Sequence, residues 1–242
     1  MEKKEFLYEG KAKKIYKTED PNLLIAEYKD SATAFDAIKK ATIEGKGVLN
    51  NTIASFFFEL LNKNSVPTHF VKKLSDREML IKKVKIIPVE VVVRNLAAGS
   101  IVKRLGIKKE TLFNPPLIEF FLKNDELHDP LICESHIYAL NLATKEDIKI
   151  MKELALKVNE ILKDFMKKQG IILVDFKLEF GKTDDGQIIL ADEISPDTCR
   201  FWDEKTKESL DKDRFRFDLG DLIEGYKKVL ERIQGEDDNA KS

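Results

Sequence analysis

Short runs of apolar and β-branched residues alternate with turn-forming residues in the N-terminal part of the chain. Such runs are typical of β-strands, and their close spacing favours an antiparallel sheet over repeated βαβ units. One longer run, about Val48–Asn62, carries Phe56, Phe57, Leu60 and Leu61 at helical spacing and predicts a helix. The strands predicted here are Glu5–Glu9, Ala12–Tyr16, Leu23–Lys29, His69–Leu74, Glu78–Val84 and Ile86–Arg94.

Helical periodicity is clearest over Thr144–Gln169, where apolar residues recur every three or four positions. Thr144 suits the N-cap of this helix, because acidic residues follow in the first turn. Gly170 suits the position just after the C-terminal end. The pattern therefore predicts a long amphipathic helix with both ends defined.

The segments on either side of this helix are less regular. Leu112–Ala143 contains three prolines, so loops and short elements are expected there. A strand hairpin is predicted over Ile171–Phe180 and Gln187–Ile194. A last amphipathic helix is predicted at about Leu219–Ile233, and the polar tail Gly235–Ser242 is expected to be disordered.

These elements predict an α+β fold with two lobes, an antiparallel-sheet N-terminal lobe and a mixed α/β C-terminal lobe. The expected divisions are residues 1–95, residues 96–234 and the tail 235–242. A length of 242 residues suits one large domain or two small ones.

Composition removes several classes of protein. The 42 basic and 43 acidic residues nearly cancel, so the net charge of −1 does not indicate a polyanion-binding surface. No apolar run approaches the ~20 residues that span a bilayer, and the N-terminus lacks the apolar stretch of a signal peptide. The two cysteines are far apart, which excludes a disulfide scaffold and suits a reducing cytosol. Abundant Lys and Glu with scarce Gln hint at a thermophilic source.

The predicted strand LVDFKLEFG carries a row of alternating charges. Side chains two apart on a strand share a face, about 6.6 Å apart, so Asp175, Lys177 and Glu179 would form one row. The returning strand would bring Asp192 to the face of Glu179. Carboxylates on adjacent strands repel unless a cation lies between them, and Mg²⁺ is commonly held by such carboxylates plus phosphate oxygens. The alternative is a solvent-facing strand with ordinary surface ion pairs.

The segment YEGKAKKIY, at residues 8–16, has no Walker A pattern. It predicts two strands around Gly10, with Lys11 and Lys13 on one face and Lys14 on the other. Two ammonium groups beside a glycine turn could hold a triphosphate. A solvated, lysine-rich hairpin is the alternative.

The segment IIPVEVVVRNLAAGS places Glu90 and Arg94 on one face of a valine-rich strand. A buried strand does not carry both charges without partners. After Gly99 comes Ser100, which suits the N-cap of a short helix and, with nearby basic residues, a phosphate group. The alternative is a capped helix beside a structural Arg–Glu pair.

Two more segments concentrate arginines. Arg200 lies in EISPDTCRFW, and Arg214 and Arg216 would share a face of DKDRFRF if that segment were extended. Arginines near a metal site favour recognition of phosphate or carboxylate, although each of them taken alone fits an ordinary surface position better. Cys199 has no histidine nearby to activate it, and the three histidines lack metal-ligand spacing.

These segments together resemble the SAICAR synthetase (phosphoribosylaminoimidazole-succinocarboxamide synthase) family over nearly the whole chain. IIPVEVVVRNLAAGS and LVDFKLEFG are similar to the two signature patterns of the family, without a gap. The resemblance is also carried by LYEGKAKKIY, NPPLIEFFLKND, HDPLI, DEISPDTCRFWD and KDRFRFDLG. Many relatives carry Ser where this chain has Cys199, and the stretch 37–44 also looks variable. The family implies a two-lobed fold similar to ATP-grasp enzymes.

The resemblance implies an ATP-dependent ligase of purine biosynthesis. It would join L-aspartate to the carboxylate of 5-amino-1-(5-phospho-D-ribosyl)imidazole-4-carboxylate (CAIR), giving SAICAR, ADP and phosphate. Because a carboxylate is a poor electrophile, it would first accept the γ-phosphoryl group as an acyl phosphate, so no side-chain nucleophile is expected. Small-molecule substrates, no nucleic acid or membrane partner, a homodimer or larger homo-oligomer and a cytoplasmic location are also implied.

The resemblance assigns each site residue a role. The residues implied for ATP are Lys11, Lys13, Lys82, Val84 and Lys123. Those implied for the ribotide substrate are Arg94, Ser100, Asp129, Arg200, Asp213 and Arg216. Catalytic positions fall on Asp175, Lys177 and Asp36, with Asp36 helping to position aspartate, and Mg²⁺ would be held by Glu179 and Asp192.

Two alternatives to the ligase stay open from the sequence. One is an ATP-dependent phosphotransferase that stops at the phosphorylated small molecule, although no HRD or DFG motif of a protein kinase occurs. The other is a non-catalytic nucleotide- or RNA-binding module, which the balanced charge and the lack of an RNP-type aromatic motif disfavour.

Overall fold

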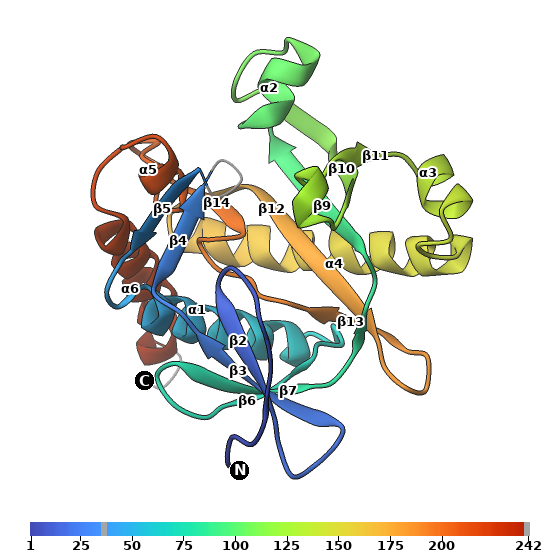
Figure 1. Ribbon diagram of the computed structural model, residues 1–242. Helices are drawn as coiled ribbons and strands as arrows, with labels where there is room; N and C mark the ends of the chain where they lie inside the picture. Colours follow the sequence, from blue (N-terminus) through green and yellow to red (C-terminus); the bar gives the residue numbers. More distant parts are fainter. Residues whose placement is uncertain (35–37, 240–242) are drawn as a thin grey trace.

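The computed structural model describes residues 1–34 and 38–239 (Figure 1). Its N-terminal part contains a five-stranded antiparallel sheet with strand order β1-β2-β3-β7-β6. These strands are β1 (Phe6–Glu9), β2 (Lys13–Lys17), β3 (Leu23–Tyr28), β6 (Phe70–Lys73) and β7 (Glu78–Lys82). A separate pair follows β3 in the sequence, made by β4 (Ser31–Ala34) and β5 (Lys39–Thr42).

A second, seven-stranded sheet has the order β11-β10-β9-β12-β13, and β8 and β14 also pair with β12. Every pairing in it is antiparallel. Its strands are β8 (Lys85–Ile86), β9 (Val89–Leu96), β10 (Leu112–Leu122), β11 (Leu131–Ile132), β12 (Ile171–Lys182), β13 (Ile188–Ala191) and β14 (Cys199–Asp203). The long strand β12 therefore touches four other strands and organises this sheet.

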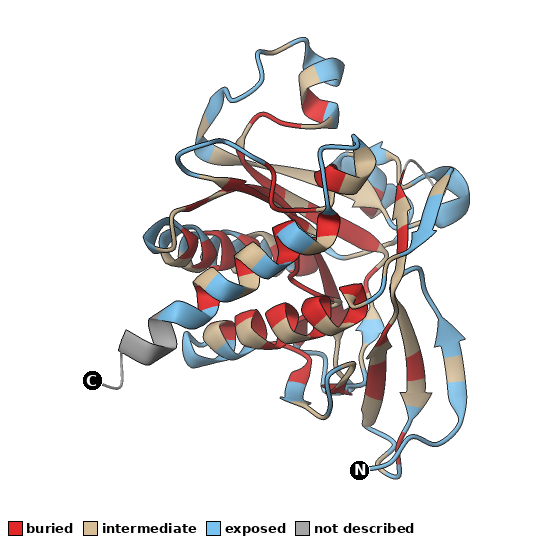
Figure 2. Ribbon diagram, turned by 90° about the vertical axis from the view of Figure 1, so that its left-hand side faces the viewer, coloured by how far each residue is buried: buried red, intermediate tan, exposed pale blue. Residues whose placement is uncertain are grey.

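Helices cover the sheets on one side (Figures 1 and 2). Helix α1 packs on the five-stranded sheet, α4 packs on β9, β12 and β13, and α6 lies against α1. The helices are α1 (Lys46–Lys63), α2 (Ser100–Leu105), α3 (Glu134–Ala139), α4 (Lys145–Lys168), α5 (Asp213–Arg216) and α6 (Leu222–Asn239), with a 3₁₀ turn η1 at Asp125–Leu127. Figure 2 shows buried residues in red along one face of the longer helices and exposed residues along the other.

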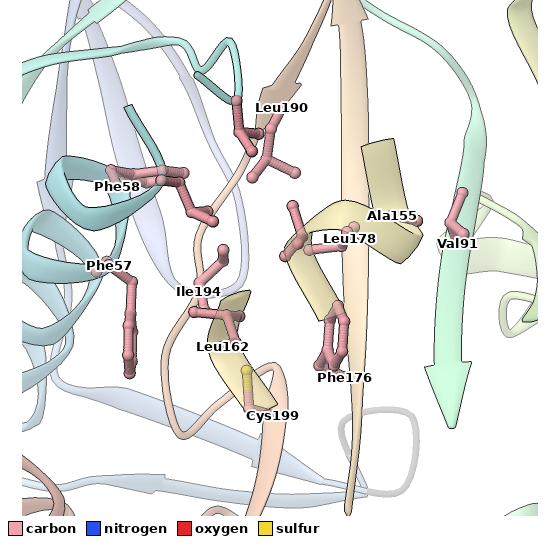
Figure 3. Packing of buried hydrophobic residues seen from close by; sticks show 14 of the residues in the cluster. Phe57, Phe58, Val91, Ala155, Leu162, Phe176, Leu178, Leu190, Ile194 and Cys199 are labelled. Carbon is pink, nitrogen blue, oxygen red and sulfur yellow. The ribbon is translucent and has the colours of Figure 1, made fainter. Parts of the chain in front are cut away.

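One hydrophobic cluster joins the two sheets through these helices (Figure 3). Phe57 of α1 is central, because its ring centroid lies 6.4 Å from that of Phe165 on α4 and 6.1 Å from that of Phe201 on β14. Phe176 and Leu178 of β12 enter the same cluster from the seven-stranded sheet. Burying this apolar surface stabilises the two sheets as one body.

The α+β fold class and the main helices are confirmed. The Thr144 hydroxyl accepts a hydrogen bond from the backbone N–H of Asp147 at 3.1 Å, and the Asp147 carboxylate accepts one from the Thr144 N–H at 2.9 Å. This capping box satisfies donors that α4 cannot pair internally. Gly170 has φ +65° just beyond the helix, as its predicted position requires.

The expectation of loops and short elements over Leu112–Ala143 is wrong in its first part. Leu112–Leu122 forms β10, which pairs with both β9 and β11. The prolines that argued against a strand fall where the register with β9 shifts, between Leu112 and Leu117. An irregularity in the ladder tolerates prolines because no regular hydrogen bond is required there.

Two predicted boundaries also differ. The predicted strand Ile86–Arg94 is divided at Pro88 into β8 and β9, since proline cannot donate to a ladder. Helix α6 runs past its predicted end at Ile233 to Asn239. Sheet membership changes between β7 and β8, earlier than residue 95, and the division into residues 1–95 and 96–234 stays a prediction.

Candidate active site

A cavity of about 320 Å³ lies where the N-terminal strands meet β12 and the segment after β13. Apolar residues of the five-stranded sheet, among them Ile15, Leu24 and Ile81, line part of it. The sequence-predicted residues that line this cavity are Lys11, Lys13, Lys82, Val84, Lys123, Asp129, Lys177, Glu179 and Asp192. The fold thus brings nine predicted site residues from distant segments to one space.

Lys13 of β2 is the link between the N-terminal hairpin and the far wall. Its Nζ donates to Asp192 Oδ1 at 2.5 Å and to Glu193 Oε2 at 3.3 Å. Burial works against a charge on Lys13, but these two carboxylates outweigh it and hold the pKa well above its ordinary value. For Asp192, burial acts to raise the pKa, and Lys13 with Lys177 overcomes it and lowers the pKa. Both groups are therefore ionised at neutral pH.

Lys177 of β12 occupies the centre of the cavity wall. Its Nζ lies 2.6 Å from Glu179 Oε1, 2.8 Å from Glu90 Oε1 and 3.6 Å from Asp192 Oδ2. Lys123 donates to the same Oε1 atom of Glu179 at 2.9 Å. Burial opposes the charge on Lys177, yet the surrounding carboxylates raise its pKa well above the ordinary value. The predicted carboxylate pair is thus gathered around one cation.

The wall near Lys82 and Val84 is closely packed. A side chain at Gly181 of β12 would collide with Val84, so only glycine lets these two segments approach. Lys11 lies at the opposite rim, 2.7 Å from Asp125 of η1 and about half exposed. The cavity therefore has an apolar part with a tight wall and a charged part with lysines and carboxylates.

A second set of predicted residues forms what we call the arginine cluster: Arg94, Asp175, Arg200, Asp213 and Arg216. Asp175 is buried between Arg94 Nη1 at 2.6 Å and Arg200 Nη1 at 2.9 Å. Asp213 is 2.8 Å from Arg200 Nε and 2.6 Å from Arg216 Nη1. Arg94 is opposite Asp175 in the register of β9 and β12. The alternation predicted for β12 holds, so Asp175 lies on the same face as Lys177 and connects this cluster to the cavity.

Two predictions about this region are wrong. The N-cap of α2 is Gly99, not Ser100, and Ser100 is the exposed first residue of the helix. Gly99 has φ +64°, and a Cβ there would lie 2.5 Å from Arg200 Nη2, so glycine is needed for this approach. The segment with Arg214 and Arg216 is not extended, because Asp213–Arg216 forms α5.

As a result, the two arginines have different surroundings. Arg214 is buried and donates to Glu208 Oε1 at 2.5 Å and to the Ser209 carbonyl at 3.1 Å, whereas Arg216 contacts Asp213. Asp36, the last predicted catalytic residue, lies outside the described residues.

Sequence reasoning missed some residues of the cavity wall. Glu193 and Asp197 are both in DEISPDT, a segment singled out for its resemblance, but neither was assigned a role. His69 and Lys212 also line the cavity. No local pattern distinguishes them, because their neighbours come from segments distant in the sequence.

Few side chains of the site are available as metal ligands. Within residues 1–34 and 38–239, no group of three or more His, Cys, Asp or Glu residues could hold a metal ion. Glu179 and Asp192, the two predicted ligands, share the ammonium of Lys177 with Glu90. In the same part of the chain, no helix combines the length and the apolar character needed to cross a bilayer.

The fold and the charged cavity can be compared with known proteins. The family model described as SAICAR synthetase matches residues 6–233. The phosphoribosylaminoimidazole-succinocarboxamide synthase of Persephonella marina is 76% identical over 234 residues, which cover 97% of this chain and 98% of that protein.

Solved structures agree with these matches. The phosphoribosylaminoimidazole-succinocarboxamide synthase of Ehrlichia chaffeensis has a TM-score of 0.93 and 49% identity, covering 95% of this chain and 98% of that chain. A SAICAR synthetase in complex with ADP has a TM-score of 0.92 and 55% identity, covering 96% of this chain and 98% of that one.

The fold and the site define an enzyme of the ligase class, which removes the non-catalytic binding module as an alternative. The chain belongs to the SAICAR synthetase family, whose members act in purine biosynthesis.

Proposed function

We propose that this protein uses ATP to join L-aspartate to the carboxylate of CAIR, giving SAICAR, ADP and phosphate. The observation that carries the proposal is the row of charges on β12. Asp175 belongs to the arginine cluster, whereas Lys177 and Glu179 line the cavity. A phosphorylated substrate held by the cluster would therefore extend its other end toward the cavity.

ATP would occupy the cavity, with its base in the apolar part near Lys82 and Val84 and its phosphates near Lys11 and Lys13. Ammonium groups are suited to phosphates as mobile point charges. The ADP complex of a relative that is 55% identical supports nucleotide binding here.

The ribotide phosphate would bind Arg94, Ser100 and Arg200. Arg94 and Arg200 converge on Asp175, and Arg200 lies against Gly99, the residue before Ser100. Planar guanidinium groups held in this way are suited to the bidentate recognition of phosphate. The remaining ribotide contacts proposed are those of Asp129, Asp213 and Arg216. Lys123 is proposed to contact ATP, and Asp36 is proposed to help position aspartate.

Lys177 would hold the reacting carboxylate of CAIR next to the γ-phosphoryl group. The carboxylate oxygen attacks phosphorus, the bond to the ADP oxygen breaks, and an acyl phosphate forms. The amine of aspartate then attacks the acyl carbon, the amide forms and phosphate leaves. Lysine charges around the reacting groups neutralise the negative charge that accumulates, so positioning and electrostatics supply the catalysis.

Mg²⁺ fits this site through Glu179 and Asp192. A single cation, the Lys177 ammonium, already lies within 2.6 Å of one carboxylate and 3.6 Å of the other. Mg²⁺ takes one or two carboxylates plus phosphate oxygens, and Glu179 and Asp192 would supply that number. When bound, the ion would supply positive charge to the nucleotide phosphates.

The test is a reconstitution with purified protein, CAIR, L-aspartate, ATP and Mg²⁺. SAICAR formation matched by release of one phosphate is expected. With ¹⁸O in the CAIR carboxylate, one labelled oxygen is expected in the released phosphate, because the acyl phosphate transfers it. Unlabelled phosphate would argue against that intermediate. Undiminished phosphate release without aspartate would instead favour the phosphotransferase alternative.

The protein is proposed to be a cytoplasmic homodimer or larger homo-oligomer. Both cysteines are free thiols, which agrees with a reducing compartment. Light scattering on the eluting protein measures the oligomeric state, and a monomer at micromolar concentration would contradict this part of the proposal. Retained activity after heating would support the hint of a thermophilic source.

A further inference from the structure

One end of the cavity contains a buried carboxylate with both of its oxygens occupied. Asp197 accepts hydrogen bonds from Lys46 Nζ at 2.5 Å on Oδ2 and from the Tyr226 hydroxyl at 2.5 Å on Oδ1. Lys46 is fully buried in the first turn of α1, and Tyr226 is fully buried on α6. These contacts fix Asp197 from two helices.

Lys212 approaches this carboxylate from the cavity. Its Nζ is 3.9 Å from Asp197 Oδ2, the oxygen already bound by Lys46, and this distance is too long for a hydrogen bond. Among the described side chains, no carboxylate lies closer to this ammonium. The Lys212 side chain is only 15% exposed, and Lys212 lines the cavity together with Asp197 and Thr198.

The other buried lysines of the cavity differ from Lys212 in this respect. Lys13 and Lys177 each have a carboxylate within 2.6 Å, and their pKa values lie well above the ordinary value despite burial. For Lys212, burial lowers the pKa, and the attraction of Asp197 does not compensate because Lys46 and Arg216 add positive charge nearby. A further anion beside Lys212 would remove this imbalance.

We propose that Lys212 binds a carboxylate of the amino-acid substrate. The proposal rests on the proposed function, which needs an anionic amino acid in the same space as the phosphates. Two ammonium groups face one carboxylate at this end, so a dicarboxylate finds uncompensated positive charge there. Lys212 lines the same cavity as Lys177 and Glu179, so an amine held here has access to the activated carboxylate.

The position of Lys212 in the chain also favours the amino acid over the nucleotide. Lys212 directly precedes Asp213, which binds Arg200 and Arg216 of the arginine cluster. The amino acid would therefore lie next to the ribotide, whereas the phosphates of ATP have Lys11 and Lys13 of the N-terminal hairpin. Asp197 would act as a positioning residue, because it holds Lys46 and attracts Lys212.

Steady-state kinetics of Lys212→Met test the proposal. Loss of a charged hydrogen bond is expected to raise the KM for aspartate by about 10- to 100-fold, with little change in the KM for ATP or CAIR. Succinate, which lacks the amine, is expected to compete with aspartate, and its inhibition constant should rise by the same factor. Lys212→Arg should recover part of the affinity. The matched control is Lys182→Met, which removes a lysine that pairs with Asp147 outside the cavity lining.

A measurement on the unmodified protein covers the case in which the variant does not fold. Acetylation of Lys212, followed by peptide mass spectrometry, is expected to slow when succinate is present. An unchanged acetylation rate at saturating succinate would overturn the proposal.

Kinetics give two further outcomes that overturn it. A lower kcat with an unchanged KM for aspartate would exclude carboxylate binding by Lys212, and an increase mainly in the KM for ATP would assign Lys212 to phosphates. Failure of the wild-type protein to form SAICAR would reject the proposed function itself, so the two failures are distinguishable.

Discussion

The cavity and the arginine cluster both combine buried positive and negative charges, but they do so with different side chains. In the cavity, the ammonium of Lys177 is shared among three carboxylates at distances from 2.6 to 3.6 Å. In the arginine cluster, Asp175 is held by two guanidinium groups, from Arg94 on β9 and Arg200 on β14.

This difference indicates how each region would meet its ligand. A lysine ammonium is a point charge on a flexible stem and can turn from a carboxylate to a phosphate without loss of geometry. A guanidinium group in a fixed fork keeps its orientation, so it recognises a shape. The cavity is therefore suited to groups that change during a reaction, and the arginine cluster is suited to a group that stays in place.

The largest expected effect follows from Asp192→Asn in the cavity. Loss of this charge removes one proposed Mg²⁺ ligand and the closest partner of Lys13, while Glu193 still pairs with Lys13 at 3.3 Å. We expect kcat to fall about 1000-fold with the fold retained. Coupled assays over a range of Mg²⁺ concentrations measure kcat, and circular dichroism shows whether the fold is retained. Asp184→Asn in the exposed β12–β13 turn is the control, and near-normal turnover of Asp192→Asn would remove Asp192 from the metal site.

In the arginine cluster, Asp175→Asn is expected to affect stability more than any single lysine in the cavity. It removes the shared carboxylate of the buried Arg94 and Arg200, which costs about 1–3 kcal/mol of unfolding free energy, because Arg94 keeps Glu119 and Arg200 keeps Asp213. Lys123→Met is the matched change in the cavity. The Lys123 side chain is 40% exposed, and Glu179 keeps its contact with Lys177. The free energy of unfolding is therefore expected to fall by at most about 1 kcal/mol. Urea unfolding measures both, and equal losses would contradict the comparison.

A pair of variants separates the two ligands. Arg94→Ala is expected to raise the KM for CAIR about 10- to 100-fold, with a much smaller effect on ATP, because its proposed partner is the ribotide phosphate. Lys13→Met is expected to raise the KM for ATP more than the KM for CAIR. Initial rates with each substrate varied in turn give both constants. Equal effects of Arg94→Ala on the two KM values would assign Arg94 a structural role.

The features that sequence alone predicted are those fixed by local spacing. The row of Asp175, Lys177 and Glu179 follows from the period of a strand, and the capping box of α4 follows from Thr144 and Asp147 three residues apart. Both are set within a few residues, so no knowledge of the fold is needed to find them.

The features that sequence alone missed depend on long-range pairing. Glu90 was recognised as a buried charge in need of a partner, but its partner Lys177 is set by the register of β9 against β12. Lys46 gave no signal, since its burial against Asp197 depends on how α1 packs on the rest of the chain. The resemblance to a known family supplied residue roles that spacing alone left open.

The smallest expected effects concern pH, and they have opposite signs in the two regions. Beside the cavity, burial lowers the pKa of His69 to about 3, below its unfolded value of about 6.5. As pH falls, the unfolded chain binds a proton on His69 before the folded protein does. The stability contributed by the neutral His69 side chain is therefore lost as pH falls from about 6.5 to about 3. Beside the arginine cluster, Asp211 accepts hydrogen bonds from the backbone N–H groups of Phe201 and Asp213.

Burial, with the nearby charge of Asp213, raises the pKa of Asp211 to about 7. The folded protein then holds the proton more tightly, so the stability contributed by Asp211 is complete below about pH 4 and is lost as pH rises to about 7. Each slope is at most about 1.4 kcal/mol per pH unit. Urea unfolding of His69→Asn and Asp211→Asn between about pH 4 and pH 8 measures both against wild type. His69→Asn should be less destabilising at low pH and Asp211→Asn less destabilising at high pH, whereas parallel curves would mean that neither group titrates as its surroundings predict.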